Sequence, residues 1–483
     1  MAILEQLERQ GVKPTRLTAD SRRVQPGDVF VAFPGAQADG RDFIAQAVAK
    51  GAAAVLAEPG VPESTKVGAG ATPILEVEGL ASVSGDIAHL VYGRPSEHLW
   101  LVGITGTNGK TSVSQWIAQA MNFLQHRCAV IGTLGNGFLD ALDASPNTTP
   151  DAITLHAALA RFVAQGADAC AMEVSSIGLD QGRVNGAAFD VAVFTNLTRD
   201  HLEYHHSMTA YAVAKERLFL RPGLAAVVLN LDDPFGVELA AKLAGRMRVI
   251  GYALDAADDS GVDEMLRAEN LEMGAAGIEF DVHGVHFAAP VVGRFNASNL
   301  LAVIGALLMR GERLQDIAAA LRSIQPPPGR MQALGGSKQP LVVVDYAHTP
   351  DALQKALGVL RETAAARGGR LVCVFGCGGE RDPGKRPQMG VVAEALADRV
   401  VVTSDNPRRE DPQAIIDDIL GGMQRPPLVE PDRARAIADA VAAADERDVI
   451  LLAGKGHEPY QEIAGVRHPF SDLDAAKSAL ERR

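Results

Sequence analysis

The order of apolar and polar positions along the chain predicts an α/β protein. Between residues 98 and 325, the runs "LWLVGIT" (99–105), "DACAMEVS" (168–175), "DVAVFTN" (190–196) and "AAVVLN" (225–230) are bounded by turn or polar residues and separated by helical patterns. Uninterrupted apolar runs of this length are typical of strands buried on both faces of a parallel sheet. This region is therefore predicted to be a doubly wound domain.

A second series of apolar runs follows the breaker "PPPGR" (326–330). The runs "PLVVVDYAHT" (340–349), "LVCVFGCGG" (371–379), "RVVVTSDNP" (399–407) and "DVILLAGKGHE" (448–458) each end in a polar, glycine-bearing or charged loop. They predict a second, Rossmann-like parallel sheet that continues to the C-terminus. Ligands of open parallel sheets bind outside the carboxyl ends of the strands, which is where these loops fall.

The N-terminal part of the chain predicts a smaller α/β unit. It combines short strands such as "DVFVAF" (28–33) with an alanine-rich stretch, "DFIAQAVAKGAAAVLAE" (42–58), that we expect to be helical. At 483 residues, of which 47% are hydrophobic and 5% aromatic, the chain is too long for a single core. We therefore expect three domains, which span residues 1–97, 98–325 and 326–483.

Charge and cysteine usage exclude several classes of partner. The formal net charge of -13 leaves no basic surplus to replace the counterions of nucleic acid or to bind an anionic membrane. The four cysteines form no CxxC pair, which fits a reducing compartment. The N-terminus lacks a signal-peptide pattern, and no window reaches the roughly 18 apolar residues of a membrane span. We expect a cytoplasmic monomer that acts on small molecules.

The segment "GITGTNGKTS" (103–112) has the features of a phosphate-binding loop. It follows an apolar strand and opens a helical pattern, so its backbone N–H groups can face a polyphosphate, Lys110 can neutralise phosphate charge and the Thr111 hydroxyl can reach Mg²⁺. Strict Walker A spacing fails at Ile104, where a glycine is expected. An ordinary glycine-rich turn is the alternative, but we predict ATP binding by Gly106, Thr107, Asn108, Gly109, Lys110, Thr111 and Ser112.

Two polar residues near predicted strand ends are candidates for the metal site. Glu173, in "AMEVSSIGLDQGRV" (171–184), could supply a carboxylate beside the Mg²⁺ of a nucleotide; the alternatives are a helix cap or a surface acid. His201 follows the strand at 190–196, but a lone histidine is more often structural than a ligand. Spacing alone decides neither case.

Lys215 lies on the apolar face of the predicted helix at 207–220. Tyr211, Leu218 and Phe219 share that face, so the lysine should be partly buried. Desolvation favours the free amine, which can react with an electrophile such as carbon dioxide. In the alternative, the lysine snorkels and its head reaches water.

The motifs resemble those of the Mur ligase family, the ATP-dependent amide-forming enzymes of peptidoglycan precursor synthesis. The resemblance covers essentially the whole chain, and the motifs occur in the family's order: "GTNGKT", "EVSSIGLDQGRV", "TNLTRDHLEYH", "FNASNLLAV", "PPPGRMQ", "DYAHTPDAL", "FGCGGERDPGKRP", "SDNPRRED" and "GKGHEPYQ". Within the family, the chain looks most like the branch that adds meso-2,6-diaminopimelate to UDP-N-acetylmuramoyl-L-alanyl-D-glutamate.

The resemblance implies roles for the nucleotide and metal residues. Thr111 and Glu173 would serve one Mg²⁺, His201 would help with a second, and Lys215 would be carbamylated and bind metal as an anion. With Lys110, the residues His201 and Lys215 are the catalytic candidates. Four further positions match residues that clasp ATP, which would sit between two domains: Asn296, Arg330, Asp345 and His348.

The resemblance also implies a site for the UDP-sugar dipeptide. In the N-terminal domain it would use Ser21 and the loop "GAQADGRD" (35–42), and in the central domain Asn147, Thr148, Thr149, Ser175, Gln181 and Arg183. The residues Asn147 to Thr149 could instead, or in addition, cap the helix predicted at 151–162.

The loop "DNPR" (405–408) has the groups that the far end of diaminopimelate requires. That end carries an ammonium and a carboxylate, for which Arg408 offers a planar bidentate fork. Arg408 could instead pair with Glu410 or Asp411 on the surface, as exposed ions often do. L-Lysine lacks the far carboxylate, so a branch selecting lysine should lack this arginine. The implied contacts are Arg381, Asp405, Asn406, Pro407, Arg408, Gly454 and Glu458.

Two other functions stay open on the sequence alone. A folylpolyglutamate synthase would share the central domain, but it would lack the N-terminal loops and "DNPR". A nucleotide-dependent scaffold or switch would use the phosphate loop to change shape rather than to transfer an acyl group.

Overall fold

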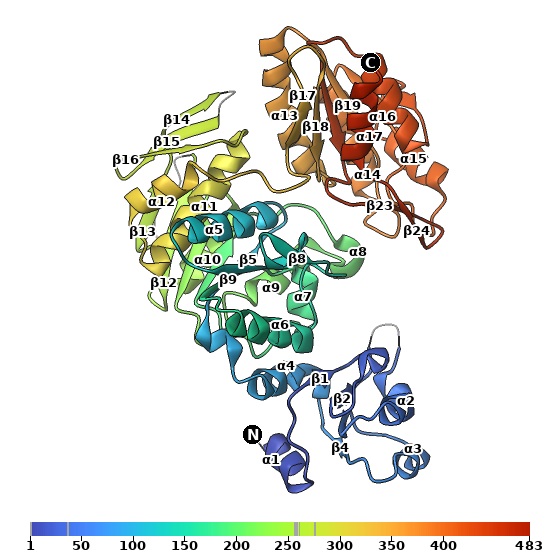
Figure 1. Cartoon of the computed structure of the whole chain (residues 1–483). Helices are drawn as coiled ribbons and strands as arrows, with labels where there is room; N and C mark the ends of the chain where they lie inside the picture. The colour runs from blue at the N-terminus through green and yellow to red at the C-terminus, as the bar shows by residue number, and fades with distance from the viewer. Residues whose placement is uncertain (1, 36–37, 256–258, 260, 275–276) are drawn as a thin grey trace. The chain divides into compact units, whose positions relative to one another are not determined.

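The computed structural model of the chain has the α/β fold class that the sequence predicts (Figure 1). It describes residues 2–35, 38–255, 259, 261–274 and 277–483. The chain divides into two compact units, one made of Met1–Thr105, Ile117–Val193 and Ala214–Val227, the other of Gly106–Trp116, Phe194–Val213 and Val228–Arg483. The domain boundaries at 97 and 325 stay a prediction.

The N-terminal sheet is parallel throughout and has the order β1-β2-β3-β4. Its strands are β1 (Leu17–Thr18), β2 (Val29–Ala32), β3 (Ala54–Ala57) and β4 (Ile74–Glu76). The helices and 3₁₀ turns around it are α1 (Ala2–Arg9), η1 (Ser21–Arg23), η2 (Gly40–Phe43), α2 (Ile44–Ala49), α3 (Glu63–Gly68), α4 (Leu80–Val91) and η3 (Pro95–His98).

The expectation of one helical stretch over residues 42–58 is wrong. Helix α2 ends at Ala49, Gly51 has a left-handed φ of 91°, and β3 then pairs with β2. A glycine in this conformation ends a helix at low steric cost. Val55 and Leu56 are fully buried in the sheet. Burial between two strands therefore outweighs the helix propensity of the surrounding alanines.

The central sheet has nine strands in the order β13-β12-β11-β10-β5-β9-β6-β7-β8. Strands β5, β9 and β6 pair in parallel, whereas β7 and β8 add antiparallel edges. The strands are β5 (Trp100–Thr105), β6 (Cys128–Gly132), β7 (Gly135–Phe138), β8 (Ala141–Asp143), β9 (Ala169–Glu173), β10 (Val191–Phe194), β11 (Ala226–Asn230), β12 (Arg248–Ala253) and β13 (Glu264–Arg267).

Helices accompany this sheet, as the alternating pattern predicts. They are α5 (Lys110–Phe123), α6 (Ala152–Ala164), α7 (Ser176–Asp180), α8 (Leu202–His205), α9 (Met208–Glu216), α10 (Pro234–Leu243), α11 (Arg294–Arg310) and α12 (Leu314–Leu321). A separate antiparallel sheet, which sequence analysis did not single out, consists of β14 (Glu269–Gly274), β15 (Gly277–Val282) and β16 (Val285–Ala289). None of the helices in the described part of the chain is long and apolar enough to cross a membrane.

The C-terminal sheet has six strands in the order β17-β18-β22-β19-β20-β21. They are β17 (Gln332–Gly335), which is antiparallel to its neighbour, and the parallel strands β18 (Leu341–Asp345), β22 (Val449–Ala453), β19 (Leu371–Phe375), β20 (Arg399–Val402) and β21 (Leu428–Val429). The remaining elements are α13 (Pro350–Arg367), α14 (Lys385–Leu396), α15 (Pro412–Leu420), α16 (Arg433–Ala442), α17 (Asp472–Glu481) and the hairpin β23 (Tyr460–Ile463) and β24 (Val466–Pro469).

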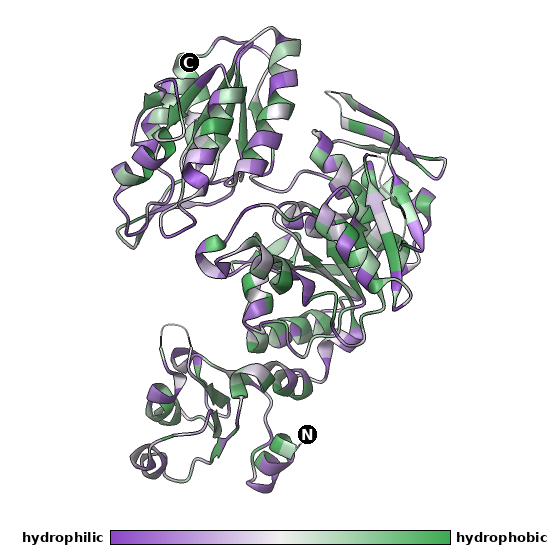
Figure 2. Cartoon of the chain, turned by 180° about the vertical axis from the view of Figure 1, so that it is seen from behind, coloured by the Kyte–Doolittle hydropathy of each residue, from purple (hydrophilic) through white to green (hydrophobic). Residues whose placement is uncertain are grey.

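Alternate residues of the C-terminal strands enter two separate cores. Val343 and Leu451 pack in one cluster, whereas Val342 and Ile450 pack in the other. This follows from the period of two along a strand. The strands are accordingly hydrophobic on both faces, and the helices around them carry both hydrophobic and hydrophilic residues (Figure 2).

The four central strands of this sheet end at the same level. Asp345 is opposite Ala453, Ala453 is opposite Phe375, and Phe375 is opposite Val402. The four loops that follow therefore leave one edge of the sheet. We call residues 346–349, 376–384, 403–411 and 454–459 the strand-end loops. They contain all seven residues predicted to bind diaminopimelate.

His156 of α6 is a fully buried histidine in the first unit. Its Nε2 is 2.9 Å from the carbonyl oxygen of Asn185, and its ring centroid is 5.2 Å from that of His89. Burial lowers the pKa of His156 to about 4. The folded state therefore takes up this proton at a lower pH than the unfolded state does.

We expect this histidine to make the first unit less stable below neutral pH. As the pH falls from about 6.5 to about 4, protonation favours the unfolded state and removes about 3 kcal/mol of unfolding free energy. Native-state hydrogen exchange of the α6 amides at pH 7, 5.5 and 4 measures this loss. In a His156→Gln variant the same amides should lose clearly less protection; an equal loss would contradict the prediction.

Candidate active site

The predicted phosphate loop connects β5 to α5. Gly106 and Gly109 have positive φ values of 147° and 89°, and a Cβ on Gly109 would collide with the side chain of Asn299. The Lys110 ammonium lies over the loop, where Nζ donates to the carbonyl oxygens of Gly106 and Thr107, both at 2.8 Å. Thr111 and Ser112 follow on the first turn of α5 and are buried. A glycine loop with a lysine at a helix N-terminus is suited to a polyphosphate.

The segment that follows β10 holds the phosphate loop in place. Thr195 Oγ1 donates to the carbonyl oxygen of Asn108 at 2.6 Å, and Asn196 Oδ1 accepts from the Asn108 N–H at 2.9 Å. Thr107 Oγ1 donates to the carbonyl oxygen of Thr198 at 3.0 Å. These hydrogen bonds fix the loop through both backbone and side chain, a role that sequence analysis did not assign to Thr195 and Asn196.

The structure brings Arg330 to the phosphate loop. Its Nη2 donates to Thr111 Oγ1 at 3.1 Å, and its guanidinium carbon lies 4.7 Å from the ring centroid of Tyr346. Asp345, at the end of β18, accepts from the Met331 N–H at 2.8 Å. Burial raises the pKa of Asp345, an effect that the Arg330 charge opposes. Arg330 and Asp345 are thus linked through the chain at Met331.

Asn296 is buried in the first turn of α11, behind the phosphate loop. Its Nδ2 donates to the carbonyl oxygen of Val292 at 2.8 Å, and its Oδ1 accepts from Asn299 at 3.2 Å. Asn299 is the residue that crowds Gly109. Asn296 is therefore one side chain away from the phosphate loop.

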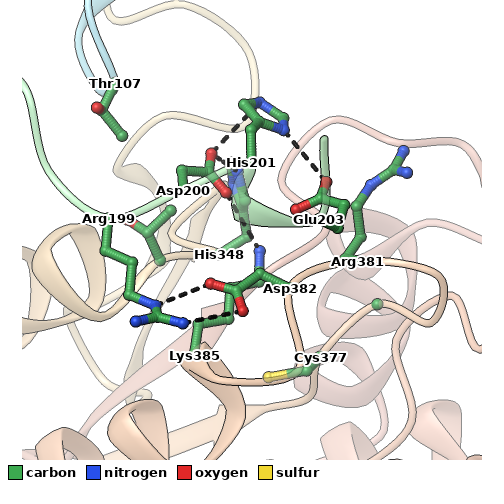
Figure 3. Close-up of polar contacts among 12 residues, drawn as sticks. Thr107, Arg199, Asp200, His201, Glu203, His348, Cys377, Arg381, Asp382 and Lys385 are labelled. Atoms are coloured by element: carbon green, nitrogen blue, oxygen red, sulfur yellow. Dashed lines mark hydrogen bonds and ion pairs between the residues drawn. The ribbon is translucent and has the colours of Figure 1, made fainter. Parts of the chain in front are cut away.

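A buried carboxylate, Asp200, lies among three cationic or imidazole side chains (Figure 3). Its oxygens are 3.5 Å from His201 Nε2, 3.6 Å from His348 Nε2 and 3.6 Å from Lys385 Nζ. Burial alone would raise the pKa of Asp200, but the hydrogen bond with His348 and the charges of Lys385 and His201 hold it well below its usual value. Asp200 is therefore ionised at neutral pH and lies close enough to orient His348.

Arg199 and Asp382 form a bidentate ion pair next to this cluster (Figure 3). Arg199 Nε and Nη2 contact the two carboxylate oxygens at 2.8 and 3.1 Å, and Asp382 is buried. Asp382 also accepts from the Gly384 N–H at 2.9 Å. Two oxygens and two donors fix both partners in orientation as well as in distance.

His201 has two carboxylate neighbours. Its Nδ1 is 3.5 Å from Glu203 Oε1, and its Nε2 is 3.5 Å from Asp200 Oδ2. The backbone of His201 is left-handed, with a φ of 54°. About a third of the side chain is exposed. The ring is thus oriented by acids and partly open, but its predicted metal role stays a prediction.

Glu173 is the last residue of β9 and is fully buried. Its Oε1 accepts from the Thr133 N–H at 2.9 Å and its Oε2 from Thr133 Oγ1 at 3.0 Å. The alternatives of a helix cap and a surface acid are therefore wrong. Thr133 Oγ1 is also 3.1 Å from Thr148 Oγ1, which brings the predicted residue Thr148 to this carboxylate.

Several residues predicted for the UDP-sugar dipeptide lie together in the first unit. Thr149 Oγ1 donates to the Glu173 carbonyl oxygen at 2.9 Å and contacts Ser175 Oγ at 3.1 Å. Arg183 donates to the Thr149 carbonyl oxygen at 2.8 Å and to Gln181 Oε1 at 2.7 and 2.9 Å. Asn147 is exposed just before them.

The alternative role of Asn147 to Thr149 as a helix cap is wrong. The N-cap of α6 is Asp151, whose carboxylate accepts from the Thr154 N–H at 3.0 Å. Ser175 does cap a helix, since its Oγ accepts from the Gly178 N–H at 3.1 Å at the start of α7.

In the N-terminal sheet domain, Ser21 is buried on η1 and donates to Gln46 Oε1 at 2.7 Å. The loop predicted at 35–42 lies partly outside the described residues, since 36 and 37 are not among them. Its described end carries an ion pair between Asp39 and Arg41 at 2.6 Å.

Lys215, on α9, is only 1% exposed. Tyr211 of the same helix is buried with it, as the helical pattern predicts. Leu218 and Phe219 are buried too, but α9 ends at Glu216, before the end of the predicted helix at 207–220. The alternative in which its head reaches water is therefore wrong. Its carbamylation stays a prediction.

The residues predicted to bind diaminopimelate meet on the strand-end loops. Asn406 Nδ2 donates to Glu458 Oε2 at 2.6 Å. Gly454 has a φ of 114°, and a Cβ there would lie 2.5 Å from Asp405 Oδ2, so only glycine allows these loops to approach so closely. Pro407 is buried, whereas Arg381 is exposed and donates to the Glu380 carbonyl oxygen at 3.1 Å.

Arg408 does not form the surface ion pairs considered as its alternative. Its Nη1 donates to the Gly379 carbonyl oxygen at 2.6 Å. Glu410 instead pairs with Arg386 at 2.8 Å, and Asp411 caps α15 by accepting from the Gln413 N–H at 3.0 Å. Within the described residues Arg408 has no carboxylate partner. Its guanidinium keeps donors for an external anion.

Sequence reasoning missed Asp200, Lys385, the Arg199–Asp382 pair and Lys455. The first four depend on contacts between positions far apart in the chain: 183 residues separate Arg199 from Asp382. Lys455 stands next to the predicted Gly454 in "GKGHE", and its complete burial is the signal that distinguishes it.

Three segments of the chain match profiles of one family. They are the Mur ligase family catalytic domain at residues 14–92, the Mur ligase middle domain at 104–307 and the Mur ligase glutamate ligase domain at 329–456. A three-domain order of an N-terminal, a central ATPase and a C-terminal domain follows, as the sequence predicts.

Two relatives match this chain over nearly its whole length. The chain is 53% identical over 481 residues to the UDP-N-acetylmuramoyl-L-alanyl-D-glutamate–2,6-diaminopimelate ligase of Chromobacterium violaceum, covering 99% of this chain and 96% of the relative. It is 54% identical over 471 residues to the protein of the same name in Pseudomonas aeruginosa, covering 96% and 94%.

Solved structures agree in fold. A UDP-N-acetylmuramoyl-L-alanyl-D-glutamate–2,6-diaminopimelate ligase superimposes with a TM-score of 0.67 at 37% identity, covering 97% of this chain and 95% of that one. The MurF ligase of Thermotoga maritima, in complex with ADP, has a TM-score of 0.68 at 19% identity over 98% of both chains, which supports the fold alone. The chain belongs to the Mur ligase family, whose members are ATP-dependent ligases.

Proposed function

We propose that this chain uses ATP to join meso-2,6-diaminopimelate to the D-glutamate of UDP-N-acetylmuramoyl-L-alanyl-D-glutamate, in peptidoglycan precursor synthesis. One observation carries the choice of amino acid: the strand-end loops hold an arginine without a carboxylate partner among the described residues, Arg408, beside the bonded pair Asn406 and Glu458. An arginine suits the far carboxylate, and acidic and amide oxygens suit the far ammonium. The full-length relatives named for this reaction support the same choice.

The two other substrates use the remaining predicted residues. ATP binds at the phosphate loop with Lys110 over its phosphates, and Asn296, Arg330, Asp345 and His348 complete its site. The dipeptide binds at Ser21 and at the group around Arg183, with Asn147, Thr148, Thr149, Ser175 and Gln181. Arg381, Asp405, Pro407 and Gly454 complete the diaminopimelate site.

The reaction proceeds through an acyl phosphate. An oxygen of the D-glutamate γ-carboxylate attacks the γ-phosphorus of ATP, the bond to the β,γ-bridging oxygen breaks, and ADP leaves. The diaminopimelate amine then attacks the acyl carbon, loses a proton and displaces phosphate. Lys110 neutralises charge on the transferring phosphoryl group, while the binding residues hold the reactants in line.

The donors of this chain fit Mg²⁺ as the metal. The described residues contain no group of three His, Cys, Asp or Glu side chains that could cage an ion. Mg²⁺ does not need such a cage, since it is usually held by one or two carboxylates together with substrate phosphates and water. Thr111 and Glu173 would hold one ion and His201 would help hold a second. When bound, the ions would supply charge neutralisation at the phosphates.

Lys215 serves this site as a carbamate. Its neutral amine attacks carbon dioxide, forms a C–N bond and releases a proton, so that a buried amine becomes an anionic metal ligand. The nearly complete burial of Lys215 supports this role, because desolvation favours the neutral amine. Electron density or a mass measurement that shows an unmodified Lys215 in the active enzyme would exclude it. The monomeric state and the cytoplasmic location likewise stay predictions.

The other two functions have less support. A folylpolyglutamate synthase of Mycobacterium tuberculosis shares the fold at 20% identity but covers only 77% of this chain. The N-terminal match and the relatives identical over the whole length favour the UDP-sugar ligase. A scaffold or switch would not need the polar groups of the strand-end loops.

ADP release with ATP, the UDP-sugar dipeptide and one amino acid at a time tests the proposal. We expect rapid release with meso-2,6-diaminopimelate and at least tenfold slower release with L-lysine or L-glutamate. Release without amino acid should also be slow, because the acyl phosphate has no amine to accept it. Equal rates with lysine and diaminopimelate would contradict the proposed specificity, and release that is independent of both would favour a switch.

A further inference from the structure

Lys455 is a completely buried cation inside the strand-end loops. It follows Gly454 directly after β22, and its side chain has no exposed surface. Its Nζ donates to Asn406 Oδ1 at 3.0 Å and to Glu458 Oε2 at 3.2 Å. Burying a lysine is costly unless its charge is paired, and here both partners belong to the proposed diaminopimelate site.

The three side chains form a closed ring of hydrogen bonds. Asn406 Oδ1 accepts from Lys455 and from the Glu462 N–H at 2.9 Å, while Asn406 Nδ2 donates to Glu458 Oε2 at 2.6 Å. Turning the amide over would set its NH₂ against an ammonium and a backbone N–H, and its oxygen against a carboxylate. Lys455 therefore fixes the orientation of Asn406.

The ring also decides which oxygen of Glu458 can receive a ligand. Oε2 is occupied by both Asn406 and Lys455. Within the described part of the chain, Oε1 receives one long contact, from the Tyr346 hydroxyl at 3.4 Å. Oε1 is thus the acceptor that is left for an ammonium.

The charges at this place balance. Asp405 and Glu458 are acidic, and Lys455 and Arg408 are basic. Three other basic side chains nearby pair with acids. Arg433 pairs with Asp472 at 2.7 Å, Arg386 with Glu410 at 2.8 Å and with Asp418 at 2.9 Å, and Arg467 with Glu462 at 3.8 Å. Arg381 is exposed, so solvent screens its charge. The charges of the ring residues Lys455 and Glu458 and of their half-buried or buried neighbours Arg408 and Asp405 therefore sum to zero.

We propose that Lys455 positions Asn406 and Glu458 and sets the preference of this site for diaminopimelate over lysine. The inference rests on the proposed function. The far end of meso-2,6-diaminopimelate is a zwitterion without net charge, whereas the far end of L-lysine is a cation. A balanced, largely dry site takes the zwitterion without leaving a charge uncompensated. Without Lys455 the site gains a net negative charge, which favours the lysine cation.

Lys455→Met removes the charge at nearly constant length, and Lys455→Arg keeps the charge. ADP release is measured at saturating ATP and dipeptide, with meso-2,6-diaminopimelate and L-lysine varied separately. For Lys455→Met we expect KM for diaminopimelate to rise at least tenfold, KM for ATP to stay within twofold, and the kcat/KM ratio of diaminopimelate to lysine to fall at least tenfold. Lys455→Arg should keep most of that ratio.

Glu458→Gln supplies the opposite change of charge. It leaves a net positive site, so the ratio of diaminopimelate to lysine should rise, even though both rates fall. Thermal unfolding shows whether Lys455→Met folds. If it does not, the diaminopimelate-to-lysine ratio of Glu458→Gln tests the proposed effect of site charge. An unchanged ratio in the folded variants would overturn the role of Lys455. A wild-type enzyme without diaminopimelate-dependent ADP release would instead overturn the proposed function.

Discussion

An Arg408→Ala variant should lose at least about 30-fold in kcat/KM for meso-2,6-diaminopimelate. Removing one partner of a hydrogen-bonded charge pair costs about 2–5 kcal/mol, and each 1.4 kcal/mol is about tenfold. Most of the loss should fall on KM for the amino acid, because Arg408 holds the far end of the molecule and not the reacting amine. The measurement is ADP release at saturating ATP and dipeptide.

Two matched variants separate this effect from damage to the loop. Arg409 is the exposed neighbour of Arg408, and Arg409→Ala should keep nearly full activity. Arg408→Lys keeps one charge but loses the fork, so it should fall between Arg408→Ala and the wild type. With L-lysine, which has no far carboxylate, Arg408→Ala should change kcat/KM by less than about threefold. A loss as large with lysine as with diaminopimelate would show that Arg408 acts only on the loop, through its hydrogen bond to Gly379.

Lys110→Met should lower kcat by about 10³-fold or more. Lys110 is placed over the phosphate loop by the carbonyl oxygens of Gly106 and Thr107, where it can contact the transferring phosphoryl group. Removing a single group that stabilises developing charge typically costs 10²- to 10³-fold, and cationic groups at phosphoryl transfer sites reach about 10³- to 10⁵-fold. KM for diaminopimelate should change little, because its proposed site uses other loops.

The control is Lys477→Met, which removes an exposed lysine from α17. It should leave kcat unchanged. Pre-steady-state ADP formation distinguishes loss of phosphoryl transfer from slow amide formation. A Lys110→Met enzyme that still makes ADP rapidly in the first turnover would contradict the assignment of Lys110 to the first step.

Apolar patterning predicts the sheets because the strands are buried on both faces. The runs at 340–349, 371–379, 399–407 and 448–458 all became parallel neighbours, since each carries apolar residues toward two cores. The same reasoning failed at 42–58, where the alanines favour a helix by propensity. There Gly51 and the burial of Val55 decided the outcome.

Site residues with a local signature could be predicted, and those defined by distant partners could not. The loop at 106–109 is marked by glycines beside lysine and threonine, so its position follows from the sequence. Asp200 is an ordinary acid in the sequence and gains its role only from Lys385 and His348, which lie far along the chain. Burial of Glu173 and Lys215 likewise depends on tertiary packing, although the apolar stripe of α9 indicated it for the lysine.

Because β18, β22, β19 and β20 end at the same level, the residues that stabilise the fold of this enzyme are separate from those that select the amino acid. The hydrophobic strands maintain the scaffold, whereas the side chains that discriminate between amino acids project from segments beyond the last paired residues. Substitutions at the polar positions of those segments leave the paired residues of the four strands unchanged. A descendant of this chain can adopt a different cell-wall building block by exchanging a few positions in these loops, buried ones such as Asn406 included, while its framework is inherited intact.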